Sequence, residues 1–217
     1  MTITKCGEFI QKGGFFVIPI LLASLFCMTR FWKLFFYLRK IRTKKTRDNF
    51  ILLKQYISKE EYEKSTELIK HMSSFLNNIF HPAWNAFLNG SDEMEEILTY
   101  CYEREIKMLK GQQQPIAVVA KLSCLLGFMG TVAGMIQIFD VISVRGSVVP
   151  QELAGGISEA LISTLTGLCV AAISWVAYYI IKGQMDRTVY ILEDMVNEYN
   201  EVIKKRKNCT EKHRDVE

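Results

Sequence analysis

The residues best suited to chemistry are a carboxylate and several hydroxyls within long apolar stretches. Glu159 begins a helical stripe that continues with Ser163 and Thr166. An ionisable side chain inside an apolar span is costly and normally faces a protein interior or a water-filled path. A carboxylate followed by hydroxyls one and two turns deeper is what relay of protons or other cations requires. The alternative is an interfacial carboxylate that reaches the headgroups from the outer end of its span.

Two threonines, Thr131 and Thr164, lie at nearly equal chain distance from the middle of the connection between two apolar stretches. On helices, both would lie roughly 15 to 20 Å from the turn, near the middle of a membrane. A threonine in lipid usually donates its hydroxyl to a carbonyl of its own helix, so one threonine alone indicates little. Two hydroxyls at one depth favour a shared polar path.

Small residues recur at helical spacing around these polar positions. They predict two faces that pack closely, which is the common role of small residues four apart in membrane helices. The predicted packing residues are Gly127, Gly130, Gly134, Gly156, Ala160 and Gly167.

Motifs for other chemistries are missing from the sequence. It contains no P-loop, no GxSxG and no HExxH, so we expect neither a catalytic site nor a cofactor. The six cysteines form no CxxC pair, and the three histidines show no ligand spacing. A metal site and a disulfide framework are therefore not expected.

Three apolar segments must hold these residues, and each exceeds the roughly 20 residues that cross a bilayer. We expect them at 15–38, 116–144 and 156–181. A cleaved signal peptide explains the first segment poorly, because a dense basic run follows it without a small-residue cleavage site. The expected fold class is an all-α membrane protein with three transmembrane helices, extended by long cytoplasmic helices.

Positive charge is concentrated directly after the first and third segments. Residues 39–47 contain six cations, and residues 182–207 contain six more. Contact with lipid headgroups explains these runs better than nucleic-acid binding, because both directly follow apolar spans. By the positive-inside rule, we expect cytoplasmic sections at 39–115 and 182–217 and periplasmic sections at 1–14 and 145–155.

Helix signals also occur outside the spans. Ser58 followed by Glu61 predicts the start of a helix that continues to about Phe80 and is ended by Pro82. Asp92 followed by Glu95 predicts the start of a second helix. After the third span, apolar residues recur in steps of 4, 3, 4, 3 and 4, which is a heptad seam that could pack within one chain or between subunits. The seam consists of Met185, Val189, Leu192, Val196, Tyr199 and Ile203.

The second and third spans together resemble a known family. LLGFMGTVAGMIQIF, followed after a short loop by LAGGISEALISTLTGLCVAAIS, is similar to the signature of the ExbB/TolQ/MotA proton-channel family. The opening FIQKGGFFVIPILLASLF resembles the first span of that family. The chain departs from the family pattern at Ser174, where a proline is common, and at Ser123 and Cys124, where Ala-Pro is common. These departures leave the pore positions intact and put the bending of the helices in doubt.

The resemblance implies roles for individual residues. It implies that Thr131 and Thr164 line a central pore, that Glu159 is its acidic residue, and that Ser163 and Thr166 belong to the same pathway. In the family, typically five copies surround two single-span helices of the ExbD/TolR/MotB type, whose aspartate accepts the proton. Proton flow then turns one ring against the other.

The expected function is therefore that of a subunit of a bacterial inner-membrane proton-channel motor, similar to ExbB or TolQ. The proton motive force would energise TonB- or Tol-dependent envelope transport through a TonB- or TolA-like protein. The N-terminus would be periplasmic and the C-terminus cytoplasmic. The alternatives are a flagellar-type stator subunit and a purely structural membrane scaffold.

Overall fold

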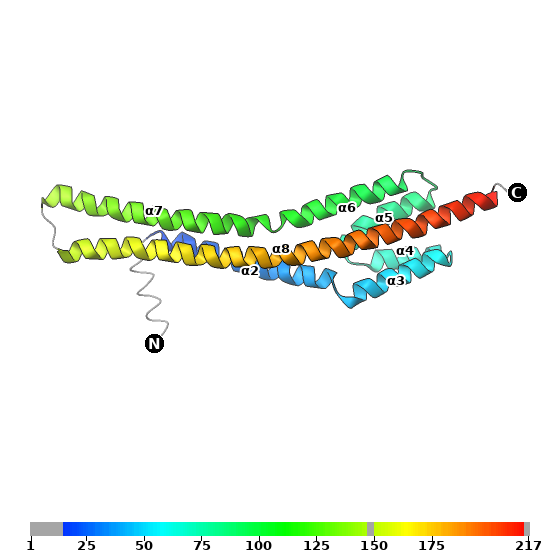
Figure 1. The fold of residues 1–217 in the computed structure, drawn as a ribbon, viewed down its shortest axis with the longest axis horizontal. Coiled ribbons are helices and arrows are strands. Elements are labelled where there is room, and N and C mark those ends of the chain that lie inside the picture. Colours follow the sequence, from blue (N-terminus) through cyan, green and yellow to red (C-terminus); the bar gives the residue numbers. More distant parts are fainter. Residues whose placement is uncertain (1–14, 147–149, 215–217) are drawn as a thin grey trace. The chain divides into compact units, whose positions relative to one another are not determined.

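Helices make up all regular secondary structure in the described part of the chain (Figure 1). The computed structural model describes residues 15–146 and 150–214. The helices are α2 (Val17–Ile41), α3 (Lys44–Ser58), α4 (Tyr62–His71), α5 (Ser74–Leu88), α6 (Met94–Gly111), α7 (Gln114–Arg145) and α8 (Pro150–Arg214). The predicted all-α class is confirmed.

Three stretches of helix are long and apolar enough to cross a membrane. They fall within Val17–Ser58, Met94–Val144 and Leu153–Arg206. The chain is thus a multi-pass membrane protein with three candidate spans. α8 already begins at Pro150, although the third span was expected to start at residue 156. The predicted lead-in at 1–14 lies outside the described residues.

Contacts divide the chain into two compact units. Among the described residues, the first unit comprises 15–34 and Gln113–Lys182. It holds most of α2, all of α7 and the first half of α8. The second unit comprises Phe35–Gln112 and, within the described residues, 183–214. It holds the end of α2, α3 to α6 and the second half of α8.

In the first unit, α7 and α8 run antiparallel and lie side by side (Figure 1). Proline stands in the first turn of both helices, where its missing N–H leaves no helical hydrogen bond unmade. Gly146 ends α7 with a φ of 68°, a left-handed conformation that suits glycine at a helix end. These local signals delimit the two helices that carry the predicted functional residues.

In the second unit, the predicted heptad seam of α8 packs within the same chain. Met185, Leu192, Val196, Tyr199 and Ile203 are buried, and Val189 is half-buried. The Tyr199 ring lies 4.8 Å from the ring of Phe80 on α5, measured between centroids. Burial of these aromatic rings stabilises the unit. Of the two predicted alternatives, packing within one chain and packing between subunits, the seam shows the first.

Two predicted features of the section between the first two spans were wrong. Ser58 does not cap the helix that follows it, because it is the last residue of α3 and its hydroxyl donates to the Lys54 carbonyl oxygen at 2.8 Å. The helix expected to continue to about Phe80 instead ends at His71, and α5 begins at Ser74. Pro82 lies inside α5 rather than at its end.

The second capping box also differed from its prediction. α6 begins at Met94, close to the expected place, but the residue at its N-cap is Glu93, which makes no side-chain capping hydrogen bond. The Glu93 backbone N–H instead donates to the Ser91 hydroxyl oxygen at 3.2 Å.

Candidate proton pathway

Glycines allow the backbones of α7 and α8 to approach closely. A Cβ atom on Gly167 would lie 2.5 Å from the carbonyl oxygen of Ser123 and 2.8 Å from the Cα atom of Gly127. A Cβ atom on Gly127 would lie 3.1 Å from the Cα atom of Gly167. Backbone atoms cannot rotate aside as side-chain ends do, so these two glycines limit the distance between the helices.

The small residues that follow toward the connecting loop continue the same contact. Gly134 faces Ala160, and Gly156 faces Ile138, where an added Cβ atom would lie 2.8 Å and 2.7 Å from the respective side chain. Gly130 faces the side chain of Ser163. All six small residues singled out in the sequence thus lie where the two helices meet. The contacts pair residues that are nearly equally distant along the chain from residue 147.

This register sets the relative depth of the two threonines. Thr131 lies one residue on the loop side of the contact between Gly130 and Ser163, and Thr164 lies one residue on its other side. The two threonines therefore lie at nearly the same level, within about 3 Å along the helix axis. Their hydroxyls nevertheless have different acceptors. Thr164 Oγ1 donates across the contact to the Gly127 carbonyl oxygen at 2.9 Å, whereas Thr131 Oγ1 donates to the Phe128 carbonyl oxygen of its own helix at 2.7 Å.

The predicted polar stripe of α8 consists of Glu159, Ser163 and Thr166, and these three side chains differ in burial. Ser163 is buried and donates to the Ala160 carbonyl oxygen at 2.7 Å, and half-buried Thr166 donates to the Ile162 carbonyl oxygen at 2.8 Å. Glu159 is exposed in the single chain. Within the described residues, no hydrogen bond joins Glu159 to either hydroxyl, so the stripe is contiguous in space without forming one hydrogen-bonded chain.

Glu159 also lies apart from the two threonines. It precedes Thr164 by five residues, which corresponds to about 7.5 Å along the helix axis. Glu159 is therefore nearer to the α7–α8 connection than Thr131 and Thr164 are.

Sequence reasoning missed the acceptor of the Thr164 hydroxyl. The sequence contained the information needed to find this acceptor. Counting residues outward from the middle of the α7–α8 connection places Thr164 opposite the turn of α7 from Gly127 to Gly130. Two serines that depart from the family pattern also lie in buried positions. Ser123 is fully buried, its hydroxyl has no hydrogen-bond partner among the described residues, and Ser174 is 2% exposed.

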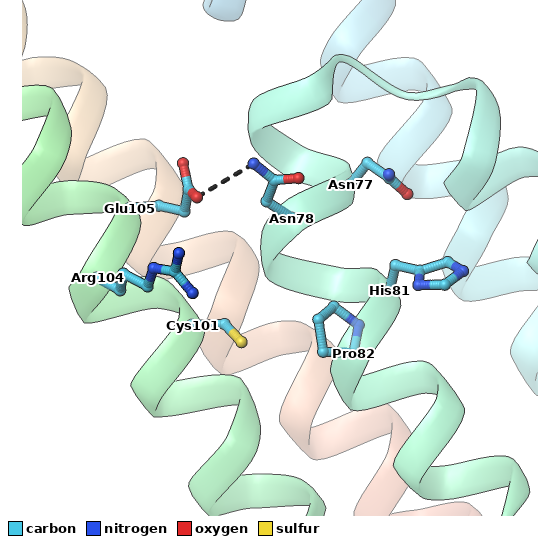
Figure 2. A pocket seen from close by; sticks show the side chains of 7 residues that line it. All are labelled: Asn77, Asn78, His81, Pro82, Cys101, Arg104 and Glu105. Carbon is cyan, nitrogen blue, oxygen red and sulfur yellow. Dashed lines mark hydrogen bonds between the residues drawn. The ribbon is translucent and has the colours of Figure 1, made fainter.

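A polar pocket of about 290 Å³ lies in the second unit, between α5 and α6 (Figure 2). Asn78 of α5 donates to the Glu105 carboxylate of α6 at 3.1 Å, and Cys101 and Arg104 extend from α6 toward α5. Burial raises the pKa of the Cys101 thiol above its ordinary value. None of the predicted pathway residues lines this pocket.

The described residues also include no group of three histidine, cysteine or acidic side chains that could hold a metal.

Comparison with known proteins bears on this pair of helices directly. Residues 67–194 match the sequence profile described as the MotA/TolQ/ExbB proton channel family. The match covers more than half of the chain, including all of α7 and the part of α8 that packs against it. The chain belongs to the MotA/TolQ/ExbB proton channel family. The resemblance inferred from the residues is therefore confirmed, and this is a family of channels rather than of enzymes.

Relatives within the family carry ExbB and TolQ names. The chain is 24% identical over 203 residues to the putative biopolymer transport protein ExbB-like 1 of Synechocystis, which covers 90% of this chain and 79% of that protein. It is 34% identical over 86 residues to the biopolymer transport protein exbB1 of Vibrio cholerae, covering 39% and 38%. It is 39% identical over 75 residues to the Tol-Pal system protein TolQ of Haemophilus influenzae, covering 35% and 33%. The last two matches thus span well under half of either protein.

Proposed function

We propose that the protein is a subunit of an inner-membrane proton-channel motor that energises TonB- or Tol-dependent envelope transport. The family and the names of the ExbB and TolQ relatives support this class. The observation that carries the proposal is the contact of α7 with α8, where Thr131 and Thr164 lie at nearly the same level within two candidate spans.

The proposed pathway consists of one titratable group and the hydroxyls that follow it inward. Glu159 takes up the proton near the loop end, and the hydroxyls of Thr131, Ser163, Thr164 and Thr166 continue the path. Each of these hydroxyls already donates its hydrogen to a backbone carbonyl. A hydroxyl oxygen that donates can still accept a hydrogen bond, so each remains able to orient water or a partner side chain.

Exposure of Glu159 supports assembly with other subunits. A charged group in an apolar span is costly unless protein or water covers it, and the single chain leaves this carboxylate exposed. We propose a homo-oligomer, a pentamer as in the family, whose α7 and α8 helices surround an ExbD/TolR-like partner with a single span. The partner would receive the proton and transmit work to a TonB- or TolA-like protein.

Charge placement supports the proposed orientation. The basic run at 39–47 directly follows the first span, and a second basic cluster lies at 204–207. The positive-inside rule places both in the cytoplasm, with the N-terminus and the α7–α8 connection in the periplasm.

Proton flux into vesicles that contain the full chain and its partner tests this function. Thr131→Val keeps the shape of the side chain and removes the hydroxyl, so we expect most of the flux to be lost. Thr29→Val is the matched control, because Thr29 on α2 donates to the Phe26 carbonyl oxygen in the same way as Thr131 donates to Phe128. If both variants conducted and energised transport like the parent, a structural scaffold would explain the packing better.

A further inference from the structure

A second pocket in the second unit lies directly beyond the end of α2. It has a volume of about 460 Å³ and is lined by the α2–α3 connection, the first half of α3 and one face of α8. Ile41, the last residue of α2, is part of its wall. The pathway described above uses none of the residues that line this pocket.

Positive charge predominates around this pocket, which is lined by four cations and by two carboxylates, Asp194 and Glu198. Arg42, Lys44 and Arg47 line it, are exposed, and form no ion pair within the described part of the chain. Lys54, which also lines it, is instead paired with Glu198 at 2.6 Å. Two further cations of α8 are also paired, Lys204 with Glu95 and Arg206 with Glu60. Three cations without an ion pair among the described residues thus line this one pocket.

Apolar side chains form the remaining wall. Phe50 and Met195 are buried beneath the pocket, whereas Ile51 and Ile191 are 42% and 43% exposed. Isoleucines left this open beside three free cations suit a ligand that is anionic at one end and apolar at the other. A small inorganic anion would leave this apolar surface uncovered.

Position along the chain indicates where such a ligand would come from. α2 begins at Val17, and roughly 20 helical residues cross the hydrocarbon layer, so Ile41 lies about five residues beyond it. Five residues rise about 7.5 Å, which matches the thickness of one headgroup layer. The Thr43 side chain makes no capping hydrogen bond to α3, and the Thr46 N–H donates to the Thr43 carbonyl oxygen at 2.9 Å. The N–H groups of Lys44 and Lys45, at the start of α3, can therefore face an anion.

We propose that this pocket binds the phosphate headgroup of an anionic phospholipid, with Arg42, Lys44 and Arg47 around the phosphate and Ile51 and Ile191 against the glycerol and upper acyl chains. The bound lipid ties the α2–α3 corner and α8 to the membrane surface. The proposal is independent of proton conduction, because lipid binding requires neither the partner protein nor an open channel.

Lipid titration of the purified full chain in detergent, followed by native mass spectrometry, tests the proposal. We expect dioleoylphosphatidylglycerol to bind at least about tenfold more tightly than dioleoylphosphatidylcholine. The triple variant Arg42→Gln, Lys44→Gln, Arg47→Gln should lose that preference. The control Lys59→Gln, Lys70→Gln, Lys107→Gln removes the same charge from exposed positions outside the pocket and should keep it.

Two further arms separate the sources of affinity. Ile51→Gln leaves every cation in place and should weaken phosphatidylglycerol binding without affecting the fold, which circular dichroism checks. Inorganic phosphate should compete poorly even at millimolar concentration. Equal loss of binding in the two triple variants would overturn the proposal, as would competition by phosphate as strong as that of the lipid.

Discussion

Thr164 donates its hydroxyl hydrogen across the helix contact to the backbone carbonyl oxygen of Gly127, at 2.9 Å. The acceptor belongs to one of the two glycines that limit the approach of α7 to α8. A residue of the proposed pathway therefore also holds the two spans together. Changes at this position should affect helix packing and proton conduction at once.

Thr164→Val removes this donor while keeping the shape of the side chain. We expect the free energy of unfolding in detergent to fall by about 1 kcal/mol, the usual size of a hydrogen bond between membrane helices. Thr164→Ser keeps the donor and should stay within about half of that loss. Thr166→Val is the matched control, because Thr166 donates within its own helix. Equal destabilisation by the Val variants at 164 and 166 would contradict a special role for the bond to Gly127.

Gly167→Ala should force α7 and α8 apart. The added Cβ atom would meet the Ser123 carbonyl oxygen at 2.5 Å, and this backbone atom cannot move without shifting the helix. We expect a loss of about 1 to 3 kcal/mol in thermal or denaturant unfolding, which is typical of overpacking. Gly155→Ala on the same helix meets no atom within 4 Å and should be neutral or slightly stabilising. A similar effect of both changes would argue against the close contact.

Glu95 provides a pH-dependent contribution to the stability of the second unit. Its carboxylate accepts hydrogen bonds from Lys204 at 2.8 Å and Asn200 at 2.7 Å, and these bonds hold its pKa below the usual value of 4.5. Because the folded-state pKa is depressed, the stabilisation is present above pH 4.5 and is lost as the pH falls through the folded pKa.

Glu95→Gln should therefore lower the melting temperature at pH 7 and lower it less at pH 3. The contribution is at most about 1 kcal/mol, because the pair is exposed to solvent. Glu96→Gln, at the exposed neighbouring position, should leave the melting temperature unchanged at both values. A difference between Glu95→Gln and the parent that persisted undiminished in acid would show that the charge is not responsible.

Tyr199→Phe should stabilise the second unit. The phenol oxygen is buried and has no hydrogen-bond partner among the described residues, while the ring packs against Phe80. Removing the hydroxyl keeps the ring contact and ends the desolvation of an unpaired polar group, which favours folding by about 1 kcal/mol. Chemical denaturation of the two proteins measures this difference, and a less stable phenylalanine variant would mean that the hydroxyl is bonded.

The membrane half of the fold was predictable from sequence because its signals are long. Apolar stretches and four-residue spacing of small residues extend over whole spans, so single exceptions do not obscure them. The seam from Met185 to Ile203 was predictable for the same reason. Whether it packed within the chain depended on the ring of Phe80, which lies more than a hundred residues away in sequence.

Short local signals were less reliable. Ser58 and Glu61 fit a capping box, yet the Ser58 hydroxyl donates backward to Lys54, a bond that ends one helix instead of starting the next. Pro82 removes the helical hydrogen bond to the Asn78 carbonyl, a loss that usually ends a helix. α5 continues past it beside the polar pocket that Asn78 and Arg104 line, where a freed carbonyl is not sealed in an apolar core.

The account depends most on Glu159 as the titratable group of the pathway. Proton flux into partner-containing vesicles, followed with a pH-sensitive dye, measures its role in Glu159→Gln, which keeps the shape of the side chain and cannot ionise. Asp140→Asn is the control, because Asp140 is also an exposed carboxylate and lies on α7 near the α7–α8 connection. The account predicts that flux falls at least about tenfold in Glu159→Gln and is unchanged in Asp140→Asn. Parental flux in Glu159→Gln would contradict it.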